Sequence, residues 1–395
     1  RLGVFPATFD LAAVEAVTVG LDAASVPNLL GDLVAKSLVV HDPARQRYRL
    51  LETIRLFAAR RLDDAGLRDE VTELLRRHVA ARATALPRVR AWLSATLAAR
   101  SRDDLENVRL AFDASLDRGD LTAAVDIALG LSTLWRNAVS YAEGRRWVAT
   151  LGDRDLSPED RLWTLILTAD VGLGSGDPRM MRDAIEEASA LSAELGDPGA
   201  AVITTTFEAM VLLVRPSLAV PLLEDARDRA RAAGEPGLER VARAYRLVAM
   251  RLLGHTRGLV DEARALTETE YGWDYDRYIC LWAASLLALV DRDGPRLRRL
   301  MDAQLADLMA NGLRENWLTM YWQALASIGG REEYLPQLRR ARRRAEAEGR
   351  SASADCVLAL AYDAACGDRW ERAATLLGAS RKALQRDTAS FVHLT

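Results

Sequence analysis

The chain has 395 residues, of which 50% are hydrophobic and 28% charged, and its formal net charge is −3. This length exceeds what one small hydrophobic core can organise and suits two or more domains, or a solenoid. The near-neutral charge excludes a global electrostatic attraction to nucleic acid or to anionic lipid. The bulk composition therefore indicates an ordinary soluble protein.

The cysteines and the apolar stretches indicate the compartment. Cys280, Cys356 and Cys366 are too few for a disulfide framework, and we expect buried free thiols in a reducing cytoplasm. No signal peptide is recognisable, and the longest apolar stretch, 279–290, is shorter than the roughly 20 residues of a membrane crossing. Because the chain begins at Arg1, within a patterned segment, we expect it to be a piece of a longer cytoplasmic protein.

Residues 1–66 predict a winged-helix-like module, because their periodicity changes from helical to strand-like and back. Asp10 is placed to cap the first helix, and the last helix carries Ile54, Phe57, Ala58 and Leu62 on one face. The expected elements, in chain order, are helices at 11–17 and 26–36, strands at 37–40 and 48–51 around a turn at 41–47, and a helix from Glu52.

From about residue 67 onward the sequence predicts helices only, and their breaks recur. Gly196, Gly234, Gly272, Gly312 and Gly349 are separated by 38, 38, 40 and 37 residues. Pro198 and Pro236 follow two of these glycines, as expected where one helix ends and another begins. Weaker breaks lie inside the units, at 176–178, 254, 293–294 and 367–368.

A period in the high thirties with two helices per unit is typical of tetratricopeptide-like (TPR-like) solenoids, whose units bury apolar faces only by stacking on neighbours. We therefore predict a mostly all-α protein, a small winged-helix-like module followed by a TPR-like α-helical solenoid. The expected ranges are 1–66 for the module, 67–156 for a helical linker or start of the superhelix, and 157–395 for the helical-hairpin repeats.

Motifs for catalysis are missing from the sequence. A phosphate-binding P-loop needs a Gly-Lys pair, but Lys36 follows Ala35 and Lys382 follows Arg381. The four histidines are isolated, and no His-Glu-x-x-His or Cys-x-x-Cys spacing suggests a metal site. The glycine-rich run 172–176 follows no strand, so we expect a loop there. We predict no enzyme and no cofactor or metal in this chain; an active site of scattered carboxylates stays open as an alternative.

Two side-chain clusters could bind a partner. Aromatic residues gather in two successive units, and their spacing suggests either core packing or a groove for a peptide or small inducer. These residues are Tyr278, Trp282, Trp317, Tyr321 and Trp322. The densest basic run suggests either a solvated helix face or a site for an acidic partner or nucleic acid. It comprises Arg339, Arg340, Arg342, Arg343 and Arg344.

Several segments resemble one family. They are Leu2 to Phe5, Phe9 to Leu11, Tyr48 to Arg55 with Phe57 and Ala58, Asp104 to Arg109, Glu143 to Trp147, and Ala373 to Ala379. Together they resemble large bacterial STAND-type regulators, the AfsR-like and LuxR-like ATPases. The resemblance implies an ATPase core, with its ATP or ADP, in a neighbouring N-terminal domain, and often a LuxR-type helix-turn-helix beyond the C-terminus. It also implies that the winged helix packs against bound ADP in the inactive state, while the superhelix receives an inducer or partner.

One departure from the family concerns nucleotide sensing. Related ATPases often carry a Met-His-Asp triplet after the winged hairpin, whereas the matching positions here are Leu50, Leu51 and Glu52. No imidazole is available at these positions to sense the nucleotide's β-phosphate.

The leading hypothesis is a non-catalytic regulatory and sensing region of a STAND-type transcriptional regulator, with a protein partner or small-molecule inducer and its own ATPase domain as partners. A TPR-like scaffold without an inducer is one alternative. DNA binding through the winged helix is another, but the would-be recognition helix 26–36 carries Asp32 and only Lys36 as a base. We therefore expect no direct DNA contact by this chain and no membrane contact.

Overall fold

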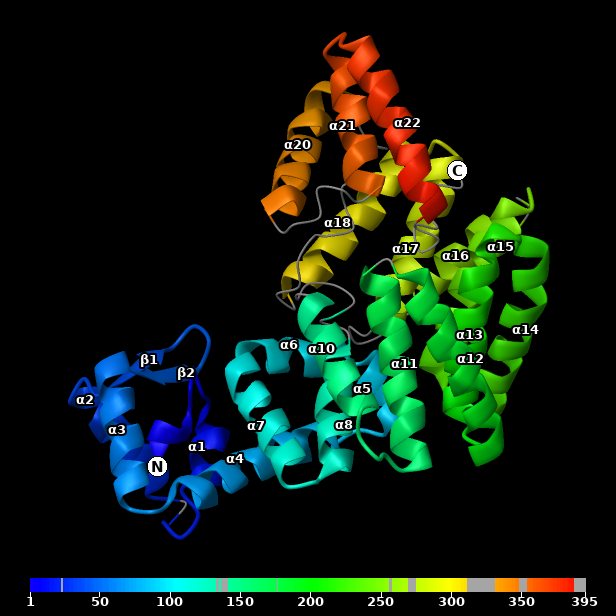
Figure 1. The fold of residues 1–395 in the computed structure, drawn as a ribbon. Helices are drawn as coiled ribbons and strands as arrows, with labels where there is room; N and C mark the ends of the chain where they lie inside the picture. The colour runs from blue at the N-terminus through cyan, green and yellow to red at the C-terminus, as the bar shows by residue number, and fades with distance from the viewer. Residues whose placement is uncertain are drawn as a thin grey trace. The chain divides into compact units, whose positions relative to one another are not determined.

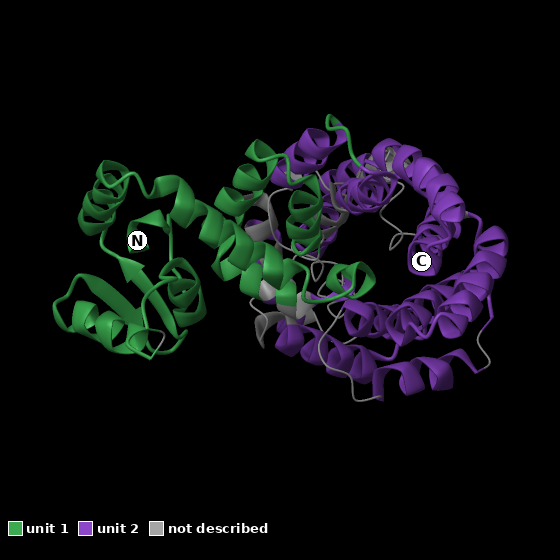
Figure 2. Ribbon diagram, turned by 90° about the horizontal axis from the view of Figure 1, so that it is seen from below, with its two compact units in different colours: residues 1–92, 97–132, 153–156 green, residues 93–96, 133–152, 157–395 purple. Residues whose placement is uncertain are grey.

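The computed structural model describes residues 1–22, 24–132, 135, 141–175, 177–255, 258–268, 275–310, 331–347 and 354–386. The chain divides into two compact units (Figure 2). Unit 1 comprises residues 1–92, 97–132 and 153–156, and unit 2 comprises residues 93–96, 133–152 and 157–395. Each unit is described by itself below.

The first part of unit 1 is the predicted winged-helix module (Figure 1). The carboxylate of Asp10 accepts a hydrogen bond from the backbone N–H of Ala13 and so caps the first helix. The two strands pair antiparallel, with Val39 opposite Leu50 and Asp42 opposite Arg47. The elements are a 3-10 helix η1 (Leu2–Val4), α1 (Leu11–Val17), α2 (Val26–Ala35), β1 (Val39–Asp42), β2 (Arg47–Leu50) and α3 (Glu52–Asp64).

An aromatic stack holds the start of the chain against the hairpin. Phe9 pairs its backbone with Tyr48, so residue 9 adds a short bridge beside β2. The Phe9 ring is fully buried and stacks on Phe5, with ring centroids 4.4 Å apart. Gly3 lies so close to α3 that a Cβ there would come within 2.5 Å of the backbone of Ala58 and Ala59. The module therefore has a tightly packed interior despite its size.

Unit 1 continues with helices that pack on the module. The helix α4 (Arg68–Ala83) contacts α1 on one side and α7 (Leu105–Asp117) on the other. The remaining helices of this region are α5 (Arg88–Leu93), α6 (Ala95–Asp103) and α8 (Leu121–Leu129). Asp120 caps α8 through the backbone N–H of Ala123. Through α4, the module and the first helices after it share one core.

Unit 2 is a succession of helices in which the described helices from α10 to α18, and again from α20 to α22, each pack on the helix that follows. Its helices are α10 (Tyr141–Gly152), α11 (Pro158–Ser175), α12 (Pro178–Leu195), α13 (Pro198–Val211), α14 (Pro216–Ala232), α15 (Pro236–Leu252), α16 (Leu259–Glu268), α17 (Tyr275–Val290), α18 (Gly294–Ala310), α20 (Arg331–Ala347), α21 (Ala354–Cys366) and α22 (Trp370–Arg386). A short 3-10 helix η2 (Leu212–Val214) follows α13. Sequential packing of paired helices is the defining contact of a solenoid.

The helix boundaries follow from caps that the sequence encodes. Asp177 and Asp197 each precede a proline and accept a hydrogen bond from a backbone N–H in the first turn of α12 and α13. Gly196 and Gly234 end the preceding helices with φ of 66° and 70°, a conformation that favours glycine. The other three periodic glycines, at 272, 312 and 349, lie outside the described residues.

The predicted fold class is confirmed: the chain is mostly α-helical, with one two-stranded sheet among the described residues, and a winged-helix module precedes paired helices. The boundary predicted at 66 falls between α3 and α4, and the one predicted at 156 falls just before α11. The loop expected over 172–176 was wrong in its first four residues, because α11 continues to Ser175. A Cβ at Gly172 would lie 2.8 Å from the backbone nitrogen of Met181, so this glycine permits a close contact between α11 and α12.

None of the helices in the described part of the chain combines the length and the apolar character of a membrane span. Within the same residues, no cluster of three or more His, Cys, Asp or Glu side chains could hold a metal ion.

Candidate functional site

A buried polar cluster, here called the wing clasp, joins the hairpin of the module to the helices that follow it. It consists of Thr8, Arg47, Arg82, Asp104 and Asn107. Arg47 projects from β2, Arg82 from the last turn of α4, and Asn107 from α7, while Asp104 directly precedes α7. The clasp lies wholly within unit 1.

The Arg47 guanidinium is the centre of the wing clasp. Its Nη2 donates to the carbonyl oxygen of Thr8 at 2.9 Å and to the hydroxyl of Thr8 at 3.1 Å. It also pairs with the Asp104 carboxylate. Both side chains are almost fully withdrawn from solvent, and a buried guanidinium needs such partners to offset its desolvation.

Asp104 receives a second arginine, so its charge is neutralised from two directions. Nη1 of Arg82 donates to Oδ2 of Asp104 at 2.7 Å. The amide of Asn107 donates to the carbonyl oxygen of Thr8 at 2.8 Å and completes the connection between α7 and the residue next to the hairpin. Removing the Asp104 carboxylate would leave the buried Arg47 with only the more distant carboxylate of Asp10, at 3.8 Å.

His78 lies on α4 near this cluster, half-buried. Burial lowers the pKa of its imidazole, and the Arg82 guanidinium lowers this pKa further, while the carboxylates of Asp10 and Asp104 oppose both effects. The imidazole Nε2 is buried and has no hydrogen-bond partner. The surroundings therefore favour the neutral form of His78.

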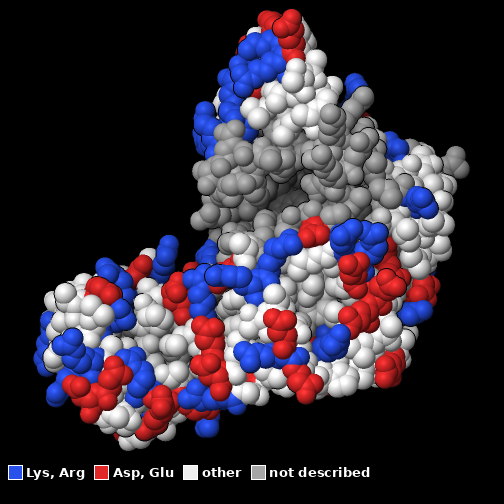
Figure 3. All heavy atoms as spheres, viewed as in Figure 1, with Lys and Arg blue, Asp and Glu red and all other residues white. Residues whose placement is uncertain are grey.

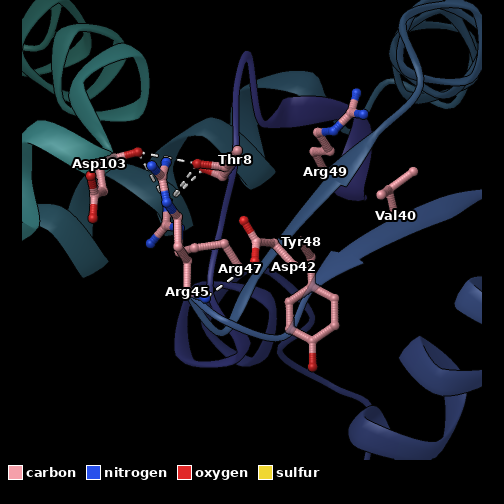
Figure 4. Close-up of a pocket in the computed structure, with 8 residues that line it drawn as sticks. All are labelled: Thr8, Val40, Asp42, Arg45, Arg47, Tyr48, Arg49 and Asp103. Carbon is pink, nitrogen blue, oxygen red and sulfur yellow. Dashed lines mark hydrogen bonds between the residues drawn. The ribbon is translucent and has the colours of Figure 1, made fainter.

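A small cavity of about 250 Å³ opens beside the wing clasp (Figure 4). Its lining residues are Thr8, Val40, Asp42, Arg45, Arg47, Tyr48, Arg49 and Asp103. The Asp42 carboxylate caps the hairpin turn, accepting hydrogen bonds from the N–H groups of Ala44 and Arg45. Since carboxylates and guanidiniums both line it, the cavity has no single preferred ligand charge.

The face of α3 that the sequence pattern identified is only partly covered. Leu62 is buried, but Phe57 is 65% exposed, and the neighbouring Leu56 and Leu51 are also exposed. Ile54 and Ala58 are intermediate. The periodicity correctly identified an amphipathic helix, and η1 packs on it at Ala58 and Ala59, but Phe57 is left facing solvent. Contiguous exposed apolar side chains of this size commonly mark an interaction surface.

The predicted aromatic groove is only partly within the described residues. Tyr278 and Trp282 lie on α17 and are 6% and 7% exposed. Trp282 contacts Tyr245 of α15, with ring centroids 5.5 Å apart, and Tyr278 stacks on Tyr275 at 6.2 Å. These contacts are those of core packing. Trp317, Tyr321 and Trp322 lie outside the described residues, so the groove stays a prediction.

The predicted basic run lies on α20, where basic side chains gather on the face shown in Figure 3. Arg339 pairs with Asp363 of α21 at 2.7 Å, so part of the run holds two helices together. Arg340 and Arg343 are exposed, and Arg342 is intermediate. The side chain of Arg344 is outside the described part. An acidic partner for the exposed arginines stays a prediction.

Sequence reasoning missed the wing clasp as a site. Asp104 and Asn107 were noted only within the segment that carries the family resemblance, and Arg47 was read as part of a turn. No periodicity links residues 57 positions apart, such as Arg47 and Asp104. The available signal was the excess of polar residues at 104–107 just before an apolar helical stretch.

Comparisons with known proteins agree with the winged-helix module. Residues 1–63 match the family described as a winged helix-turn-helix domain. Over 304 residues the chain is 31% identical to HTH-type transcriptional regulators of Mycobacterium tuberculosis and of Mycobacterium bovis, covering 71% of this chain and 34% of theirs. The chain thus spans about a third of the length of these relatives.

A solved structure was also found. It is a signal transduction ATPase with numerous domains (STAND) protein with a tetratricopeptide repeat sensor, from Pyrococcus horikoshii. The similarity has a TM-score of 0.43 and 11% identity, and covers 97% of this chain and 62% of the other. The chain therefore carries a winged helix-turn-helix domain and is homologous to transcriptional regulators.

Proposed function

We propose that this chain is the non-catalytic regulatory region of a STAND-type transcriptional regulator. In this proposal the winged-helix module docks on an ATPase domain of the longer polypeptide, and the paired helices of unit 2 receive an inducer or a partner protein. Binding to one of two states then shifts the equilibrium between them. The homology to HTH-type transcriptional regulators supports the regulatory role.

The exposed apolar face of α3 carries the proposal. Phe57 is 65% exposed, and Leu56 beside it is 54% exposed. The exposed Arg60 and Arg61 lie one turn further along α3, so this surface offers apolar contact area with a basic border, as many protein–protein interfaces do. The wing clasp adds a physical link, because it fixes the hairpin to α4 and α7. A shift of the module would therefore move those helices with it.

The experiment replaces Phe57 with Asp in the longer polypeptide that contains the ATPase domain. Release of a fluorescent ADP analogue should accelerate at least about tenfold, because a buried carboxylate opposes docking of the module. The matched control is Leu86→Asp, which changes an exposed leucine of unit 1 outside the module. Unchanged ADP release in the Phe57 variant, with a normal circular dichroism spectrum, would contradict the docking.

A second candidate, DNA binding, is favoured by the winged helix-turn-helix match and by two arginines of the hairpin, Arg45 in its turn and Arg49 on β2. The test is fluorescence anisotropy of the chain with a random 30-base-pair duplex at low salt. Binding that is lost in an Arg45→Glu, Arg49→Glu variant would support it. No binding at low salt would remove it.

A further inference from the structure

A cavity of about 310 Å³ lies between α16 and α18, two helices of unit 2 that are not adjacent in the chain. On α16 its lining runs from Val260 to Glu268, the last residue of that helix, and on α18 it begins at Asp293, which directly precedes the helix. Pockets for small molecules begin at roughly 300 Å³. The cavity therefore suits a small metabolite rather than a protein segment.

Three arginines from two helices line this cavity. Arg264 belongs to α16, while Arg296 and Arg299 lie in the first two turns of α18. Nη2 of Arg296 donates a long hydrogen bond, of 3.5 Å, to the carbonyl oxygen of Val260, so this side chain reaches across from α18 to α16. A group bound in the cavity would meet guanidiniums from both helices.

The positive charge of these arginines is largely unbalanced. Within the part of the chain that the structure describes, neither Arg296 nor Arg299 has a carboxylate at ion-pair distance. Arg264 pairs with Asp261 at 3.6 Å, but both side chains are more than half exposed, and such a pair binds weakly. The cavity therefore holds two guanidiniums without a counter-charge and a third with a weak one.

The two carboxylates that line the cavity do not neutralise these arginines. Asp293 accepts a hydrogen bond from the backbone N–H of Arg296 and so caps α18. Glu268 is exposed and forms no ion pair among the described residues. The cavity beside the wing clasp differs in this respect, because its central arginine, Arg47, is already paired with Asp104. An anion is thus favoured between α16 and α18.

We propose that this cavity binds the phosphate group of a small metabolite through Arg264, Arg296 and Arg299. A guanidinium donates paired, charge-assisted hydrogen bonds that match the geometry of phosphate oxygens. A doubly charged phosphate would also balance the two arginines that lack a carboxylate partner in the described residues. The inference names the ligand class of the inducer in the function proposed above, and in that respect it rests on that proposal.

The test is isothermal titration calorimetry of the 395-residue chain with inorganic phosphate at low ionic strength. We expect saturable binding of one phosphate per chain, which sodium chloride at the same ionic strength does not reproduce. Arg299→Gln changes an exposed side chain and should weaken the binding at least about tenfold, because it removes a hydrogen bond between charged groups. Absence of saturable binding to the unmodified chain would overturn the proposal.

Two further substitutions separate this cavity from a general attraction of phosphate to arginine. Glu268→Gln removes a carboxylate that lines the cavity and repels phosphate, so it should strengthen the binding. Arg340→Gln, at an exposed arginine of the basic run on α20, is the matched control and should leave the binding unchanged. Equal weakening by Arg299→Gln and Arg340→Gln would overturn the site.

The calorimetry does not involve the ATPase domain, so its failure would leave the test of module docking with Phe57→Asp unaffected. The role as inducer has its own measurement, the release of the fluorescent ADP analogue from the longer polypeptide. Phosphate should change the rate of release, and Arg299→Gln should abolish this change. Saturable binding without any change in ADP release would contradict the inducer role and support the binding site alone.

Discussion

Arg47 on β2 and Asp104 at the start of α7 form a buried ion pair, although 57 residues separate them in the sequence. This ion pair holds the hairpin of the winged-helix module against α4 and α7 of unit 1. Apolar packing alone would allow the hairpin to slide on its neighbours, whereas a buried charge pair is satisfied in one arrangement only. The wing clasp therefore gives the module a fixed position on α4 and α7.

Asp104→Asn should destabilise unit 1 by about 3 kcal/mol, because it removes the closer of the two carboxylates that face the buried Arg47 guanidinium and leaves only Asp10, at 3.8 Å. Urea denaturation followed by circular dichroism measures this loss. The neighbouring Asp103→Asn is the control. Its side chain is 41% exposed and pairs only with Arg102 among the described residues, so the expected change is within about 0.5 kcal/mol. Equal effects of the two substitutions would mean that the clasp does not stabilise the module.

His78 should make stability depend on pH. Its folded-state pKa is lowered by burial, and next by the Arg82 guanidinium. The unfolded chain therefore binds more protons than the folded chain between the lowered pKa and the usual value near 6.5. Stability should fall as the pH drops below about 6.5, with a slope of at most about 1.4 kcal/mol per pH unit.

The measurement is the free energy of unfolding of the wild type and of His78→Gln at pH 7.5, 6.5 and 5.5. The difference between the two should narrow as the pH falls, because only the wild type loses stability through this imidazole. The exposed His255, replaced by Gln, is the matched control for a His-to-Gln substitution. A parallel pH dependence of wild type and His78→Gln would refute the role of His78.

Glycines in two helices should respond oppositely to alanine. Gly172→Ala places a Cβ 2.8 Å from the backbone nitrogen of Met181, so α11 and α12 must separate, at a cost of about 1–3 kcal/mol. Gly31, within α2, has no atom within 4 Å of the added Cβ, and Gly31→Ala should stabilise by about 0.5–1 kcal/mol through the entropy of the unfolded chain. Thermal unfolding of both variants checks the signs, and a neutral Gly172→Ala would argue against the close helix contact.

Local rules predicted the elements that depend on neighbouring residues. The cap at Asp10, the hairpin after Val39 and the helix ends at Gly196 and Gly234 each require only a few adjacent side chains, so the sequence was sufficient. The loop predicted over 172–176 was wrong because the same local rules do not include contacts with other helices. Glycines usually break helices, but the close approach of Met181 from the next helix makes glycine useful inside α11. That information lies in tertiary packing.

Faces and partners were harder to predict than elements. Periodicity predicted that Ile54, Phe57 and Leu62 share one face of a helix, and the structure contains that helix, α3. Periodicity does not say whether another element covers that face. Similarly, the spacing of Tyr278 and Trp282 was compatible with a groove or with a core. The neighbour of Trp282 on α15, Tyr245, comes from a helix more than 30 residues earlier, which the sequence pattern alone does not identify.

Trp282→Ala separates those two interpretations. Trp282 is 7% exposed and contacts Tyr245, so its truncation should cost about 3–5 kcal/mol of unfolding free energy through the cavity left between α15 and α17. Trp370→Ala is the control, because that ring is 65% exposed and its loss should change stability by no more than about 0.5 kcal/mol in the 395-residue chain. If Trp282→Ala changed the unfolding free energy as little as Trp370→Ala, the Trp282 indole would not be a packing residue, and the groove interpretation would be favoured. The expected ranking would assign Trp282 to the core, and a search for an inducer site would then turn to other surfaces of unit 2.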